Sequence, residues 1–532
     1  MDFAVALGEP AEKLGLVAAT GAAVAALLLP DVRRRAAALA AAVVIAAVVL
    51  VGHIWNTDQF RSISGNPSRF ALLLVLGLTA VVALGALFER RPALFPLAAV
   101  ATLPFRVPID AGGSTVNLLV PLYVVIAGAA AAYCWRAATS EQSPAASERP
   151  GLLEMALAVF LGLYALQSLY SRDLANALEQ TVFFYVPFAV LFVLLRQVRW
   201  TRSQLLGCIG VLVALGLVFS VIGFWEYDHR ELLWNPKVIN ANQAESYFRV
   251  NSVFWDPNVY GRFLALVMVV LAGIMLWSGR LRVALAMAAA LAVLWGGLVL
   301  TFSQSSIASL LAGLATLAAL RWDVRRTVAA SVVGIVAAAV LVLSFQSALH
   351  LHLGSSSGLN TATSGRSNLI QGGVELFADR PLWGQGSGAF ARAYRLERKG
   401  NQQNATSASH TMPITVAAEQ GLIGLAAYLA LLAAAFVTLL GFRRPAEAPD
   451  PAPGALDGDV SAADLGAYPV ARAALAAAFV TLVAHTMMYA AFLEDPFTWV
   501  ILAVGASIAS YVRVPASRRA SAPSAAAAHA TA

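Results

Sequence analysis

Residues 409–424 have the sequence Ser-His-Thr-Met-Pro-Ile-Thr-Val-Ala-Ala-Glu-Gln-Gly-Leu-Ile-Gly, and they open a long apolar segment. His410 therefore stands where a membrane helix is expected to meet water, and Pro413 suits the first turn of that helix. Imidazole titrates near neutral pH and can accept a proton from a hydroxyl group. The positive end of the helix dipole favours the neutral imidazole that a general base requires. The same position also fits a histidine that only caps or hydrates the helix end.

The composition places most of the chain in a membrane. Of the 532 residues, 59% are hydrophobic and 12% are charged, with a mean hydropathy of +0.72, whereas soluble proteins carry about 25% charged residues. Alternation with a period of two is absent, which argues against an outer-membrane barrel. Cys134 and Cys208 both lie in apolar segments, so neither a disulfide framework nor a cysteine metal site is expected. The basic residues lie between the apolar segments, which is a signal of membrane topology and does not indicate a nucleic-acid partner.

The hydropathy pattern predicts an all-α, polytopic integral membrane protein with about 12–15 transmembrane helices and two large periplasmic loops containing short helices. Apolar segments lie near 14–30, 36–52, 70–88, 93–104, 117–135, 152–170, 180–195, 204–225, 259–277, 283–300, 306–320, 328–346, 413–440, 470–489 and 497–512. Clusters of arginine fall on alternate connections, which places those connections and the C-terminus inside the cell. The loops 226–258 and 347–412 are then outside.

The first outer loop ends in Phe-Arg-Val-Asn-Ser-Val-Phe-Trp-Asp-Pro-Asn, residues 248–258. Pro257 is expected in the first turn of the next span, with Asp256 or Asn258 as its cap. Arg262 follows one turn inside, where its guanidinium group can hold a phosphate through paired N–H groups. The alternative for Arg262 is snorkelling to lipid headgroups.

The second outer loop has apolar residues at 369, 370, 374 and 377, which predicts an amphipathic helix along the membrane surface. Asp379-Arg380-Pro381 is expected to end it, and a glycine-rich turn follows at 384–388. Arg392, Arg395 and Arg398-Lys399 form a basic stripe that fits anionic lipid, a phosphate-bearing substrate or a solvated face. Glu419 is a carboxylate in the outer part of the next span, a position that usually needs a partner.

Several motifs together resemble the O-antigen ligase family, which includes O-antigen polymerases and bacterial O-linked oligosaccharyltransferases. The resemblance covers about 205–425 and rests on His410 with Gly421-x-x-Gly424, on the Arg249–Asn258 run, on Gly-Arg-Ser at 365–367 leading to 379–386, and on Thr-Phe-Ser-Gln at 301–304. Two positions depart from the family pattern. Thr411 follows the histidine where Asn, Ser or Gln is usual, and Gln304 stands where Arg is frequent.

The resemblance implies a metal-independent, inverting glycosyl transfer that uses no cofactor, on the periplasmic face of the bacterial plasma (inner) membrane. The donor would be a glycan on undecaprenyl pyrophosphate, whose leaving group carries several negative charges. His410 would be the catalytic base, and Arg249 and Arg366 would bind the pyrophosphate. The expected substrate-binding set is completed by Arg262, Asp256, Asn258, Arg392, Arg395 and Glu419.

The acceptor stays open between lipid A–core for a ligase, the end of another lipid-linked repeat for a polymerase, and a protein hydroxyl for an oligosaccharyltransferase. The alternative from another class is a polysaccharide or lipid transporter or flippase, whose binding groups would lie near the bilayer midplane. The expected organisation is N-terminal transmembrane helices at 1–204, a catalytic region at 205–440, a cytoplasmic linker at 441–469, C-terminal helices at 470–512 and a disordered tail at 513–532.

Overall fold

The computed structural model describes residues 8–55, 65–111, 114–139, 149–233, 236–244, 247–344, 366–397, 409, 411–441 and 462–512. Within these residues the chain is helical apart from one antiparallel hairpin, β1 (Val107–Ala111) with β2 (Ser114–Leu118). The all-α expectation is confirmed, although the hairpin was not predicted. His410, Arg398 and Lys399 lie outside the described residues. Helix ends that the arginine pattern places outside the cell are called outer below, and the opposite ends inner.

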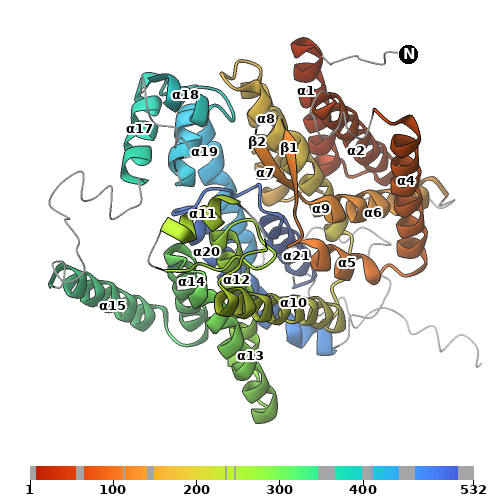
Figure 1. Ribbon diagram of the computed structural model, residues 1–532. Coiled ribbons are helices and arrows are strands. Elements are labelled where there is room, and N and C mark those ends of the chain that lie inside the picture. Colours follow the sequence, from red (N-terminus) through yellow and green to blue (C-terminus); the bar gives the residue numbers. More distant parts are fainter. Residues whose placement is uncertain are drawn as a thin grey trace, which may run out of the picture.

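The described helices are those of a multi-pass membrane protein (Figure 1). Ten segments in the described residues are long and apolar enough to cross a membrane, and two further apolar helices are shorter. The apolar segment predicted at 93–104 forms α5 (Leu94–Thr102), which at nine residues is too short to cross a bilayer alone. In order, the remaining helices of the first part are α1 (Glu9–Leu28), α2 (Val32–Ile54), α4 (Pro67–Arg90), α6 (Val120–Thr139), α7 (Leu152–Ser168), α8 (Leu174–Gln180), the π-turn η1 (Thr181–Tyr185) and α9 (Val186–Arg196).

The helices of the second part are α10 (Arg202–His229), α11 (Pro236–Ala244), α12 (Pro257–Trp277), α13 (Leu281–Leu300), α14 (Gln304–Arg321), α15 (Val324–Ser344), α17 (Arg366–Asp379), α18 (Phe390–Glu397), α19 (Met412–Leu440), α20 (Ala462–Thr486) and α21 (Pro496–Val512). α12 is the central helix, and it packs against α10, α13, α14 and α20 (Figure 1). Small residues permit these close approaches, because a Cβ on Gly313 of α14 would lie 2.7 Å from Val269 Cγ2 of α12.

The outer loops contain the short helices that the sequence predicted. α17 covers the expected amphipathic stretch and ends at Asp379, and α18 follows the glycine-rich turn. Figure 1 shows α17 and α18 gathered beside the outer end of α19. Leu369, Leu376, Phe390 and Tyr394 form a small apolar core there together with Ala418 of α19.

α19 is broken at Gly421, and the break is the point where the second outer loop attaches. Gly421 has φ 65° and ψ −163°, a conformation open only to glycine. The N–H groups after the break donate to the loop, from Leu422 to Pro381 O at 2.7 Å and from Ile423 to Leu382 O at 3.5 Å. In return, Gln385 N–H donates to Ala418 O at 3.0 Å. The segment Pro381–Gly386 therefore supplies the partners that the broken helix lacks.

The same segment is held from its other side by the connection between α7 and α8. The Tyr170 hydroxyl and the Gln167 amide both donate to Trp383 O, at 2.6 and 3.3 Å, and the Gln167 amide also reaches Gln420 O at 3.0 Å. Ser387 Oγ donates to Tyr164 O at 2.8 Å. The N-terminal helices thus contribute directly to the placement of the outer loop.

We expect Gly421→Ala to lower the stability of the folded protein by about 2 kcal/mol or more, because a side chain at this φ is strained and an added Cβ would lie 2.4 Å from the Leu382 carbonyl. Thermal unfolding of the purified protein in detergent measures the effect. Gly162→Ala in α7 is the matched control, since its Cβ would meet nothing within 4 Å. Equal midpoints for the two variants would show that the break is not needed.

Candidate functional site

The outer ends of α10, α12, α14, α19 and α20 meet in one polar region. Its base is the start of α12, where Asp256 is the N-cap, its carboxylate accepts the Asn258 N–H at 2.6 Å, and Pro257 occupies the first turn. The predicted helix start at this point is confirmed. Capping by Asp256 fixes the direction of Asn258, whose side chain then faces its neighbours on α14 and in the first outer loop.

Arg249 is held against the start of α12. Its Nε donates to Thr301 O at 3.0 Å, and its Nη2 donates to Asn258 Oδ1 at 3.2 Å. The Asn242 side chain braces the backbone of Arg249 with two further hydrogen bonds, at 3.0 and 3.1 Å. Both acceptors of the guanidinium group are neutral oxygens, so these bonds orient the charge without neutralising it.

Glu226 fastens the chain segment that carries Arg249. This glutamate lies at the outer end of α10 with 0% exposure, and its carboxylate accepts the backbone N–H groups of Ser252 at 2.7 Å and Asn251 at 3.1 Å. Ser252 has a φ of 50°, and its hydroxyl donates to Phe219 O at 2.9 Å. Sequence reasoning missed Glu226, although a carboxylate at the end of an apolar span is itself a signal of a specific partner.

A chain of polar contacts runs from Asn258 to α20. Ser303 Oγ donates to Asn258 Oδ1 at 2.9 Å and lies 2.8 Å from Ser306 Oγ. His485 Nε2 lies 3.2 Å from Ser306 Oγ, and the whole histidine is buried. Met487 lies two residues after His485, and its carbonyl oxygen accepts a hydrogen bond from the Thr411 hydroxyl at 3.1 Å. The residue next to His410 and the guanidinium group of Arg249 thus belong to one connected region.

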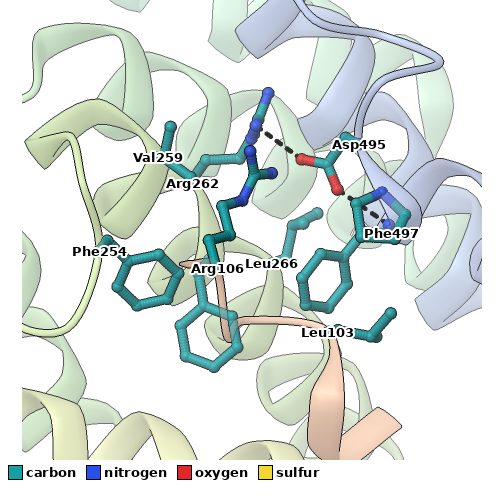
Figure 2. Close-up of a pocket in the computed structure, with 10 residues that line it drawn as sticks. Leu103, Arg106, Phe254, Val259, Arg262, Leu266, Asp495 and Phe497 are labelled. Carbon is teal, nitrogen blue, oxygen red and sulfur yellow. Dashed lines mark hydrogen bonds and ion pairs between the residues drawn. The ribbon is translucent and has the colours of Figure 1, made fainter. Parts of the chain in front are cut away.

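Arg262 forms a buried ion pair with Asp495 from the connection between α20 and α21. The Nη2–Oδ2 distance is 2.7 Å, and Arg262 and Asp495 are each 2% exposed as residues. The same carboxylate caps α21 by accepting the Phe497 N–H at 2.8 Å (Figure 2). Arg262 therefore does not snorkel to the surface. Because its charge is already paired with a carboxylate, the structure favours a structural role over the phosphate contact that the sequence had suggested.

Arg262 and Asp495 line a small cavity together with Arg106, and it measures about 10 Å³, close to the space for one water molecule. Figure 2 shows the Arg106 guanidinium group directed toward Arg262 and Asp495 from the loop before β1. Burial lowers the pKa of Arg106, while Asp495 raises it in part. Burial raises the pKa of Glu494 to about 7, and the two arginines oppose that shift. Neither Arg106 nor Glu494 was among the expected site residues.

The second outer loop contributes the other expected residues. Arg366 is the first residue of α17, and its side chain lies outside the described part. Arg392 and Arg395 are exposed on α18. Glu419 is 4% exposed, and its carboxylate accepts the N–H groups of Gly388 at 3.0 Å and Phe390 at 3.1 Å. This geometry favours a positioning role for Glu419, since its carboxylate is occupied by backbone donors.

Comparison with known protein families finds a match for one part of the chain. Residues 288–429 match the model of the O-antigen ligase family. The O-antigen ligase domain so defined runs from within α13 to within α19, and it includes His410, Arg366, Arg392, Arg395 and Glu419. The expected resemblance is confirmed over this stretch. No curated protein matches the chain.

The O-antigen ligase domain does not contain the whole polar region. Arg249, Asp256, Asn258 and Arg262 precede the matched residues, and Asp495 follows them. Asn258 contacts the matched stretch through Ser303 and Ser306, and Arg249 contacts it through the Thr301 carbonyl. The stretch that matches the O-antigen ligase model is therefore flanked by helices that contribute further residues to the polar region.

We expect Asp495→Asn to destabilise the protein by about 3–5 kcal/mol, because it leaves the Arg262 charge buried without its partner. The double variant Arg262→Met with Asp495→Asn should recover much of that loss, since it removes the unpaired charge. Unfolding midpoints of the purified proteins measure both effects. Additive losses in the double variant would show that the two side chains are not coupled.

Proposed function

We propose that this protein is a membrane glycosyltransferase that transfers a saccharide from undecaprenyl pyrophosphate to a hydroxyl acceptor on the periplasmic face of the bacterial inner membrane. The O-antigen ligase domain at 288–429 supports the reaction class. The observation that carries the proposal is the connection from Arg249 through Asn258, Ser303 and Ser306 to His485 and the Thr411 contact. That connection joins the pyrophosphate-binding candidate to the neighbour of the proposed base.

The arrangement of the helices supports the assignment of sides. Arg202 and Arg280 border one cavity at the inner ends of α10 and α13. Glu226 lies near the opposite end of α10, and Thr301, whose carbonyl accepts the Arg249 Nε–H, caps the opposite end of α13. Because clusters of arginine favour the cytoplasm, the polar region faces the periplasm in this proposal.

In the proposed reaction, the acceptor oxygen forms a bond to C1 of the donor sugar while the bond from C1 to the pyrophosphate oxygen breaks. His410 takes the proton of the attacking hydroxyl. Negative charge grows on the departing pyrophosphate, and Arg249 and Arg366 stabilise it. Attack on the face opposite the leaving group inverts the configuration at C1. This scheme needs no metal ion.

One observation weighs against the transporter alternative. Transporters place binding groups near the bilayer midplane on broken helices. α19 is broken at Gly421, but the backbone groups freed there are bound by Pro381–Gly386. Here Arg262 follows the first residue of α12 by five positions, and Glu226 precedes the last residue of α10 by three. The buried charges of these helices therefore lie near their outer ends, where a lipid-linked donor would present its pyrophosphate.

We expect His410→Ala to lower transfer by about a hundredfold or more, because a general base contributes roughly 10²–10⁴ in rate. The assay uses purified protein in vesicles with a lipid-pyrophosphate donor and measures the amount of glycosylated acceptor by gel electrophoresis. His229→Ala, at the outer end of α10, is the matched control. Wild-type transfer by a folded His410→Ala protein would remove this residue from the mechanism.

We expect Arg249→Ala to lower transfer by about tenfold or more, with a smaller loss for Arg249→Lys, because lysine keeps the charge but not the two-pronged geometry. Initial rates at several donor concentrations measure both. Arg69→Ala, exposed at the start of α4, is the control. Identical losses for Ala and Lys would indicate a purely steric role.

A further inference from the structure

A second and much larger cavity lies on the inner side of the molecule. It measures about 560 Å³ and is lined by residues of α5, α10, α12, α13, α20 and α21. Most of the α20 residues that line it are small, among them Ala467, Ala471 and Ala474. The volume is within the range of small-molecule sites, and the lining is almost entirely apolar.

The mouth of this cavity carries two arginines, and two tryptophans line the cavity, of which Trp200 is buried and Trp277 half-buried. Arg202 is the first residue of α10, and Arg280 is the N-cap of α13. Both are exposed and both line the cavity, together with Trp200 and Trp277. Tryptophan is enriched where hydrocarbon meets headgroups, and arginine binds phosphate through paired N–H groups.

The depth of the cavity matches one leaflet of a bilayer. Its α10 wall extends from Arg202 to Leu212, which corresponds to roughly 15 Å of helix. The hydrocarbon core of a bilayer is about 30 Å thick, so one leaflet accounts for about half of it. The cavity ends at Leu103, Leu266 and Phe497, which also line the small cavity of Arg262 and Asp495.

We propose that this cavity binds an anionic phospholipid of the inner leaflet, with one acyl chain in the cavity and the phosphate on Arg202 and Arg280. The site is separate from the proposed transfer reaction and does not depend on it. An isoprenoid chain descending from the outer polar region fits less well, because Leu103, Leu266 and Phe497 close the outer end and the space beyond them measures only about 10 Å³.

Occupancy has a consequence for the ion pair above the cavity. Phe497 forms part of the cavity end, and its N–H is donated to Asp495. An acyl chain packed beneath Phe497 supports the start of α21 and thereby the carboxylate that pairs with Arg262. Anionic lipid should therefore raise the thermal stability of the protein, whereas a zwitterionic lipid with the same chains should do so less.

Native mass spectrometry of the full chain tests the proposal, with phosphatidylglycerol or phosphatidylcholine of identical acyl chains added to the delipidated protein. We expect one tightly retained phosphatidylglycerol and a loss of affinity of about fivefold for each arginine removed in Arg202→Ala and Arg280→Ala. Ala471→Phe should reduce retention by filling the cavity. Arg282→Ala is the matched control, because it lies on the same helix as Arg280 but does not line the cavity.

Three outcomes would overturn the proposal. Equal retention of both lipids would exclude recognition of the headgroup by the arginines. A polyprenyl phosphate as the retained native species, identified by its mass, would assign the cavity to the donor tail. An Arg202→Ala, Arg280→Ala double variant that binds phosphatidylglycerol as tightly as Arg282→Ala, with unchanged unfolding midpoints in both lipids, would show that the cavity mouth is not a phosphate site.

Discussion

A helix inside a membrane must find hydrogen-bond partners for every backbone group, and α19 meets this requirement at Gly421 only through another segment of the chain. The break frees N–H groups on one side and carbonyl oxygens on the other, and Pro381–Gly386 engages both. The placement of α17 and α18 follows from that exchange. The same exchange explains why both segments carry a glycine, Gly421 in α19 and Gly384 in the loop. A Cβ at Gly384 would lie 2.3 Å from Glu419 O.

The two outer loops are anchored in the same way by different carboxylates. Glu226 at the end of α10 accepts three N–H groups from the first loop, those of Leu233, Asn251 and Ser252, and Glu419 near the start of α19 accepts two from the second. A buried carboxylate that receives backbone donors is far less costly than an unpaired one. Each loop is thereby fixed at the point where it carries residues of the candidate site, Arg249 in one case and the α18 arginines in the other.

The periodicity of the sequence predicts the spans, the start of α12 at Asp256–Pro257 and the helix at 366–379, because these depend on local patterns. The partners of Arg262, Glu226 and Glu419 were not predictable, since each is contributed by a segment distant in sequence or by backbone groups that carry no sequence signal. His485 is buried, and its contacts with Ser305 and Ser306 connect α20 to α14. The β1–β2 hairpin was missed because its strands are only five residues each.

Arg249 and Arg262, the two arginines near the start of α12, differ in whether a carboxylate already pairs with their charge. A donor that brings several negative charges gains from a guanidinium group whose positive charge is not already matched. Arg262 is matched by Asp495 at 2.7 Å, and a phosphate contact there would have to compete with a buried carboxylate. Arg249 is oriented by Asn258 and the Thr301 carbonyl, which are dipoles without net charge. If the proposed reaction is correct, Arg249 is therefore the arginine of this pair that can hold the pyrophosphate. Arg262 instead holds α12 to the α20–α21 connection.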